Sequence, residues 1–248
     1  MLVHASWERW STGLEPPSLA VFRYRICPAD QPWLYDLLLP DEQQRAARFR
    51  READRHRFVA GRGWLRWLIG QFTHQSPTAI QLTTGPFGKP ELLTTTTSGS
   101  NWHVNVSHAG EWVLLAVGPV PVGVDVEWIN PDWPYQDLIA SSFSAVDQAQ
   151  LAASSTPRAL FYTFWTRKES LLKATGQGLT NDLLAFSVSK EGDQCIHGLQ
   201  TEASSWMIVS FTVTDGYVGS LACQKLPESS RFFTLAATSV SIDPPTTD

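Results

Sequence analysis

The chain has 248 residues, a formal net charge of −5 and 43% hydrophobic residues, a composition typical of globular proteins. The acidic balance argues against a general nucleic-acid binder, because basic surface supplies most of that affinity. No apolar run approaches the roughly 20 residues of a membrane span, and residues 1–15 lack the apolar centre of a signal peptide. Three scattered cysteines favour neither a disulfide framework nor a zinc site. We therefore expect a cytoplasmic protein that binds neither nucleic acid nor membrane.

Hydrophobic spacing in the first half of the chain predicts a strand, then helices, then a hairpin. Alternation predicts strands at residues 19–26, 80–84, 102–107 and 111–118. A short helix is expected after Pro40 with Asp41 as its cap, and a longer helix at residues 54–72. A turn is expected at residues 85–90 and a flexible loop at residues 94–100.

After residue 120 a similar plan begins again, with a strand at 123–127, a short helix at 144–153 and a longer helix at 156–175. Further strands are predicted at residues 184–189, 206–214, 217–224 and 232–240, and the tail at 243–248 is expected to fray. Strands and helices are grouped rather than alternating, which favours two α+β lobes with antiparallel sheets over a Rossmann-type fold. The predicted division is an N-terminal lobe at 1–120 and a C-terminal lobe at 121–248.

Two motifs predict a site for a divalent metal ion and phosphate. In GVDVE (residues 123–127), strand alternation places Asp125 and Glu127 on one face. In FWTRKESLLKATG (residues 164–176), Glu169 and Lys173 stand four apart and share one face of a helix. Magnesium prefers oxygen ligands, commonly one or two carboxylates plus substrate phosphates, so these three acids are the predicted ligands. Ordinary surface ion pairs are the alternative interpretation.

For other polar residues the sequence allows either a ligand-binding role or a purely structural one. Ser107 and His108 come at the expected end of a strand beside a tight turn, where both can face a ligand or simply belong to the turn. Lys89 lies in another turn, between a glycine and a proline. One short helical stretch holds eight of the nineteen basic residues, which indicates either an anionic partner or a solvated helix face. These eight are Arg45, Arg48, Arg50, Arg51, Arg55, Arg57, Arg62 and Arg66.

No nucleophile motif and no Cys–His pair indicates a covalent mechanism, so the pattern suits direct phosphoryl-type transfer to an external hydroxyl. Seven motifs occur in order: LLPDE (38–42), ARFRREADRHRFVAGR (47–62), FGKPEL (87–92), NVSHAG (105–110), GVDVE, FS (143–144) and FWTRKESLLKATGQGL (164–179). This series covers most of the chain between Val21 and Ser189, and it resembles the 4′-phosphopantetheinyl transferases of the broad-specificity, surfactin-synthetase-activating class. The resemblance implies a monomer of two similar α+β lobes, each an antiparallel sheet packed with a long helix. A pseudo-twofold axis relates the lobes, and coenzyme A binds in the cleft between them.

The resemblance implies transfer of 4′-phosphopantetheine from coenzyme A to a serine of an apo acyl or peptidyl carrier protein, with release of 3′,5′-ADP. It implies that magnesium is held by Asp125, Glu127 and Glu169. It implies catalytic roles for Glu169, Lys173 and Asp125, with Glu169 taking the serine proton directly or through a metal-bound water. The implied contacts to coenzyme A are Arg45, Arg57, Lys89, Ser107, His108 and Lys173.

The chain departs from the family pattern at Glu42, where some relatives carry a lysine near the 3′-phosphate. Two other functions would use the same residues. One is a magnesium-dependent pyrophosphatase that cleaves coenzyme A or a nucleotide with water. The other is a module that binds coenzyme A or a carrier protein without turnover. Neither the metabolic pathway of the carrier nor tolerance for acyl-coenzyme A follows from the sequence.

Overall fold

The computed structural model describes residues 5–11, 18–85, 88–93, 102–176, 181–189, 192–195, 205–224 and 230–237. The helices are α1 (Gln31–Asp36), α2 (Pro40–Ala47), α3 (Glu52–Thr73), α4 (Gln136–Ser142), α5 (Ala145–Ala153) and α6 (Pro157–Thr175). The strands are β1 (Trp7–Arg9), β2 (Leu19–Arg25), β3 (Leu82–Thr84), β4 (Pro90–Leu92), β5 (His103–Ala109), β6 (Trp112–Gly118), β7 (Val122–Trp128), β8 (Gly192–Cys195), β9 (Ser205–Thr214), β10 (Tyr217–Cys223) and β11 (Ser230–Leu235).

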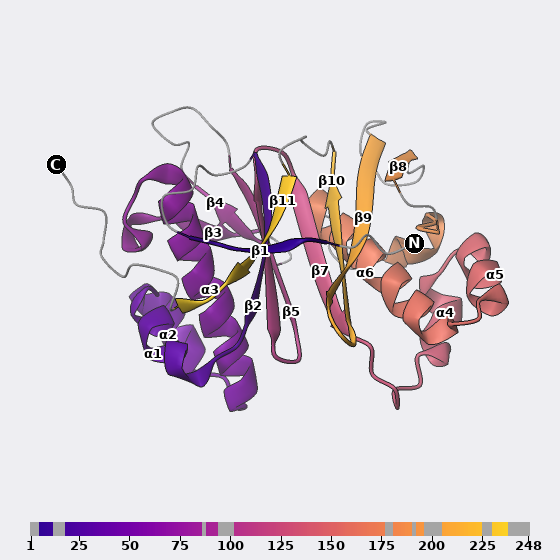
Figure 1. Cartoon of the computed structure of the whole chain (residues 1–248), viewed down its shortest axis with the longest axis horizontal. Coiled ribbons are helices and arrows are strands. Elements are labelled where there is room, and N and C mark those ends of the chain that lie inside the picture. The colour runs from indigo at the N-terminus through magenta and orange to yellow at the C-terminus, as the bar shows by residue number, and fades with distance from the viewer. Residues whose placement is uncertain are drawn as a thin grey trace.

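Two sheets lie next to each other, and each is covered by one long helix on the side away from the other sheet (Figure 1). One hydrophobic core lies between α3 and the first sheet, and a second lies between α6 and the other sheet. A third core joins the two sheets, with Leu19 and Leu114 of the first sheet packed with Val124 and Phe211 of the second. The α+β class predicted from the sequence is confirmed. The pseudo-twofold relation stays a prediction.

The first sheet has the strand order β1-β11-β2-β6-β5. The pairs β2–β6 and β6–β5 are antiparallel, as expected, whereas β11 pairs in parallel with both β1 and β2. The first sheet is therefore mixed, and its second strand comes from the far end of the chain. The lobe division at residue 120 stays a prediction, although β11 pairs within the first sheet and lies beyond that boundary.

The second sheet is antiparallel, with the order β7-β10-β9-β8, and α6 packs across β7 and β10. A short hairpin of β3 and β4 lies beside the first sheet. The tail at 243–248 and the loop at 94–100 lie outside the described residues. Within the described part of the chain, no helix combines the length and the hydropathy that a membrane span requires.

The predicted strand at residues 184–189 is wrong. Residues Asn181–Ala185 form a 3-10 helix, and residues 186–189 belong to no strand in the described part of the chain. Buried side chains satisfy its backbone instead: Lys168 Nζ donates to the carbonyls of Leu183 and Phe186 at 2.6 Å each, and Arg167 Nη1 donates to the carbonyl of Val188 at 2.9 Å. Because these polar groups are already paired, the segment needs no sheet partner.

We expect Gly123→Ala to lower the free energy of unfolding by about 3 kcal/mol or more. A Cβ atom at Gly123 would overlap the carbonyl oxygen of Ser170 and the backbone nitrogen of Ala174, neither of which can rotate away. Gly176→Ala is the control, because φ is 73° there but the surrounding space is open. It should cost only about 1 kcal/mol. Urea unfolding measures both values, and equal losses would contradict the close approach of β7 to α6.

Candidate active site between the two sheets

The edge strands β5 and β7 meet where the two sheets adjoin, and side chains rather than a backbone ladder join them. Asn105 Oδ1 accepts a hydrogen bond from the backbone N–H of Val124 at 2.8 Å, and Ser107 Oγ accepts one from Val126 at 3.4 Å. Asn105 and Ser107 are therefore buried although strand alternation turns them away from the first core. Since Val124 and Val126 flank Asp125, these bonds fix the backbone that carries its carboxylate.

Lys173, Asp125 and Ser107 form one connected polar cluster. The ammonium of Lys173 donates to Asp125 Oδ1 at 2.6 Å and to Ser107 Oγ at 3.0 Å. Ser107 Oγ also donates to Asp125 Oδ1 at 2.7 Å. Asp125 is only 3% exposed, so its negative charge is held largely by this pairing. Residues from β5, β7 and α6 thus converge at one point.

Glu127 and Glu169 extend this cluster with two half-buried carboxylates. Burial, followed by the charge of Asp125, raises the pKa of Glu127 to about 8; Glu169 also raises it, whereas Lys173 and a hydrogen bond from Trp165 lower it. Burial and the charge of Asp125 raise the pKa of Glu169 to about 7, opposed by Lys173. The charge of Asp125 therefore acts on both of these acids.

The donor set fits a cation. Asp125 Oδ2 is buried without a hydrogen-bond partner, and besides burial the charge of Asp125 raises the pKa of both Glu127 and Glu169, so a cation beside these carboxylates would be favourable. No three His, Cys, Asp or Glu side chains are already arranged as a metal site in the described ranges. Magnesium usually takes one or two protein carboxylates and completes its shell with water and phosphate, so a preformed triad is not required. The metal assignment stays a prediction.

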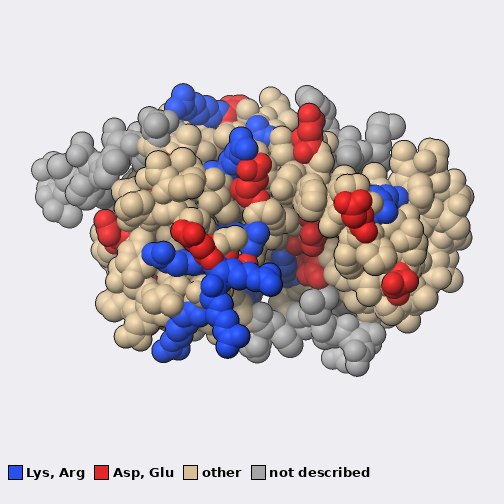
Figure 2. Space-filling view, turned by 90° about the horizontal axis from the view of Figure 1, so that it is seen from below, with Lys and Arg blue, Asp and Glu red and all other residues tan. Residues whose placement is uncertain are grey.

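An arginine-lined pocket of about 150 Å³, the arginine pocket, lies beside this cluster. Its lining includes Arg45, Arg57, Arg62 and His108, with Gly88 and Pro90 of the β3–β4 hairpin. Arg57 is anchored by Asp54 at 2.7 Å and by the carbonyl of Gly110 at 2.8 Å, and Arg45 lies over the ring of Phe58. Figure 2 shows Lys and Arg side chains gathered on the half of the molecule that holds α2 and α3. The pocket is therefore suited to an anion such as phosphate.

Glu42, which departs from the family pattern, is a buried partner of arginines. Its carboxylate accepts from Arg66 Nε at 2.6 Å and Nη2 at 3.0 Å, and it lies 3.3 Å from Arg62 Nε. The backbone N–H of Leu39 also donates to it, so Leu39 is the cap of α2, and the prediction of Asp41 as the cap is wrong. Glu42 thus holds Arg62 in the wall of the arginine pocket.

His108 lies on the rim between the arginine pocket and a larger cavity. Partial desolvation lowers the pKa of His108, and the positive charges of Arg57 and Lys173 lower it further, whereas Asp54 raises it. A neutral imidazole is therefore favoured near neutral pH, and it can donate or accept one hydrogen bond at this position.

The larger cavity, here the aromatic cavity, has a volume of about 480 Å³ and opens beside Glu127. Its walls are mainly aromatic and apolar: Trp128, Trp133, Leu138, Phe161, Tyr162 and Trp165. The sequence prediction missed this cavity, because only folding brings the segment after β7 against α6. Clustered Trp and Tyr residues after GVDVE were the available signal.

The structure brings together most of the residues singled out from the sequence. Asp125, Glu127, Glu169, Lys173 and Ser107 belong to the central cluster, and Arg45, Arg57 and His108 line the arginine pocket beside it. The side chain of Lys89 lies apart from them, because its ammonium bonds to two backbone carbonyls outside the arginine pocket.

Comparison with known proteins identifies the family to which the chain belongs. A model described as the 4′-phosphopantetheinyl transferase superfamily matches residues 121–222, and one described as 4′-phosphopantetheinyl transferase, N-terminal, matches residues 27–120. The 4′-phosphopantetheinyl transferase HetI of Nostoc sp. is 32% identical over 222 residues, which is 84% of this chain and 91% of HetI.

Two further relatives cover less of the chain. The 4′-phosphopantetheinyl transferase Sfp of Bacillus subtilis is 29% identical over 72% of this chain and 78% of its own length. A relative in Synechocystis sp. is 35% identical over 64% of this chain and 66% of its own length. The chain therefore belongs to the 4′-phosphopantetheinyl transferase superfamily, in the class that includes Sfp.

Proposed function

We propose that this protein transfers 4′-phosphopantetheine from coenzyme A to a serine of an apo acyl or peptidyl carrier protein and releases 3′,5′-ADP. The observation that carries the proposal is the Lys173–Asp125 ion pair, whose two charges both act on Glu127 and Glu169. The arginine pocket on one side and the aromatic cavity on the other supply binding surfaces for an anionic and an apolar group.

Magnesium and coenzyme A are part of the proposal. Asp125, Glu127 and Glu169 would hold the metal ion, because they are oxygen donors whose mutual repulsion a cation relieves. When bound, magnesium supplies positive charge that neutralises pyrophosphate oxygens. The arginine pocket would hold the 3′-phosphate of coenzyme A, with Arg45 and Arg57 as donors.

The remaining steps use side chains of this chain. The carrier serine oxygen forms a bond to the β-phosphorus of coenzyme A, and the bond to the bridging oxygen breaks, so that 3′,5′-ADP leaves with the electron pair. Lys173 lies where its ammonium can stabilise the charge that develops on phosphate oxygens. Glu169 is the candidate for the carboxylate that receives the serine proton.

We propose that the protein acts as a monomer and that its partner is a small acidic carrier protein. Arg48, Arg50 and Arg51 are exposed at the junction of α2 and α3, and positive charge there favours encounter with an acidic surface. A cytoplasmic location is also proposed, and the free thiol of Cys27 fits it, because such compartments keep thiols reduced.

One assay tests the function against its two alternatives. The protein is incubated with magnesium, coenzyme A and an apo-carrier protein, and the carrier is weighed by mass spectrometry. The proposal predicts a carrier that gains one phosphopantetheine group. Hydrolysis of coenzyme A without labelling of the carrier would favour a pyrophosphatase, and binding without either reaction would favour a module without turnover.

We expect Arg45→Met to raise the KM for coenzyme A by about 10-fold with kcat little changed, because it removes a charged contact made equally in the ground and transition states. The same substitution should leave the KM for 3′-dephospho-coenzyme A unchanged, since that substrate lacks the phosphate. Gln44→Met, at the exposed neighbouring position of α2, is the control for a change of surface. Equal KM changes with both substrates would place Arg45 away from the 3′-phosphate.

A further inference from the structure

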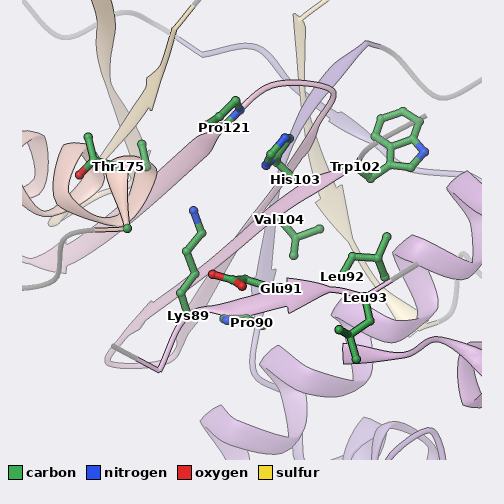
Figure 3. Close-up of a pocket in the computed structure, with 12 residues that line it drawn as sticks. Lys89, Pro90, Glu91, Leu92, Leu93, Trp102, His103, Val104, Pro121 and Thr175 are labelled. Carbon is green, nitrogen blue, oxygen red and sulfur yellow. The ribbon is translucent and has the colours of Figure 1, made fainter. Parts of the chain in front are cut away.

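The side chain of Lys89 faces away from the arginine pocket, although its neighbours Gly88 and Pro90 line that pocket. It faces a second cavity of about 440 Å³, here the junction cavity, whose lining includes Glu91, Trp102, His103, Pro121 and Thr175. Figure 3 shows the Lys89 side chain extended from the hairpin toward Pro121 and Thr175. The hairpin therefore borders the arginine pocket at Gly88, while the Lys89 ammonium reaches β7 and α6.

Two backbone carbonyls accept hydrogen bonds from the Lys89 ammonium. One belongs to Lys173, at 2.7 Å, and the other to Val122, at 3.2 Å. Lys173 lies in the last turn of α6, where carbonyls have no partner within the helix and where positive charge is favourable. Val122 is the first residue of β7. Lys89 thus forms hydrogen bonds to both β7 and α6, the two elements that carry Asp125, Glu127, Glu169 and Lys173.

The backbone of Lys89 is also held in place by a hydrogen bond and a turn. The backbone N–H of Gly85 donates to the carbonyl of Lys89 at 2.9 Å, and Gly88 turns the chain with a φ of 81° that favours glycine. Lys173 is held from both ends as a result: Lys89 binds its backbone carbonyl, and Asp125 binds its ammonium.

We propose that Lys89 is a positioning residue that ties the wall of the arginine pocket to the end of α6 and the start of β7. It thereby sets the distance between a phosphate bound in the arginine pocket and the Lys173–Asp125 pair. This inference rests on the proposed function, and it assigns Lys89 a role other than the phosphate contact implied by the family resemblance. A misplacement of about 1 Å can cost on the order of 100-fold in rate, so the tie acts on kcat.

Lys89→Met tests the inference, because it keeps the length and apolar stem of the side chain and removes both donated bonds. We expect kcat for carrier modification to fall on the order of 10- to 100-fold, while the Kd for coenzyme A, measured by calorimetry, stays within about twofold. Lys89→Arg, which can donate again, should recover most of the lost kcat. Thr84→Ala changes an exposed side chain on the same hairpin and should leave both values unchanged.

Two results would overturn the inference. One is an unchanged kcat in Lys89→Met; the other is a loss confined to coenzyme A binding, which would make Lys89 a substrate contact. If Lys89→Met does not fold, Lys89→Leu, which likewise has no donor for the two carbonyls, takes its place with the same expectations. Absence of carrier modification by the unmodified protein would instead remove the proposed function, so the two failures are distinguishable.

Discussion

Glu169→Gln is expected to lower the rate of carrier modification by at least about 10³-fold, the largest loss expected from any single substitution in this site. The change keeps the shape of the side chain but removes its charge and its ability to accept a proton. The same change should stabilise the metal-free protein. Because burial and Asp125 raise the pKa of Glu169 above its ordinary value, its charged form opposes folding once the pH exceeds that value.

At pH 8 without divalent metal, urea unfolding of Glu169→Gln should therefore show a stability gain on the order of 1 kcal/mol. Activity that falls while stability rises separates a functional carboxylate from a structural one. Glu52→Gln is the control, since Glu52 is a largely exposed acid at the start of α3 and should change neither quantity. Turnover by Glu169→Gln near that of the unmodified protein would remove Glu169 from the mechanism.

Lys173→Met is expected to lower kcat on the order of 10²–10³-fold, because it removes the cation placed to stabilise developing phosphate charge. It should also destabilise the fold by about 2–3 kcal/mol, since it leaves the buried carboxylate of Asp125 without its ion-pair partner. The figure lies below that for a fully buried pair because the Lys173 side chain is 28% exposed.

The double variant Asp125→Asn/Lys173→Met separates these two effects. Removing both charges should restore most of the stability, because no unpaired buried charge remains, but it should not restore activity. Stopped assays of carrier mass and urea unfolding give the two quantities. Recovery of turnover in the double variant would show that Lys173 acts only by neutralising Asp125.

Local patterns predicted the elements whose contacts are short in sequence or strongly periodic. Alternation predicted the β5–β6 hairpin, and apolar periodicity predicted α3 and α6. The parallel insertion of β11 between β1 and β2 was not predicted, because strand neighbours more than 200 residues apart leave no local pattern. The opposite error occurred at residues 184–189, where a strand was predicted but did not form. Phe186 and Val188 are buried as they would be in a strand, but their backbone carbonyls accept hydrogen bonds from Lys168 and Arg167 instead of from a neighbouring strand.

Some residues of the candidate site could likewise be predicted from the sequence, and others could not. Asp125 and Glu127, at a spacing of two, and Glu169 and Lys173, at a spacing of four, were found from strand and helix geometry. The direction of the Lys89 side chain was not predictable, because the turn fixes where it begins and the carbonyls of α6 and β7 decide where it ends.

Two further features around the site could not be predicted from the sequence, because they depend on tertiary contacts. Glu42 faces Arg62 and Arg66 only after α2 packs against α3. The aromatic cavity forms only when Trp128 and Trp133 meet the face of α6 that carries Trp165. Spacing along one element predicts which residues share a face, but it does not predict what that face meets.

Cation binding tests most directly whether acids from β7 and α6 act as one site. Binding of Mg²⁺ is measured by calorimetry in the presence of coenzyme A, without a carrier protein, for the unmodified protein, Glu127→Gln and Glu169→Gln. The convergence of these carboxylates predicts one Mg²⁺ per chain and a clear loss of affinity in each variant. Affinity equal to that of the unmodified protein in both variants would contradict a shared metal site.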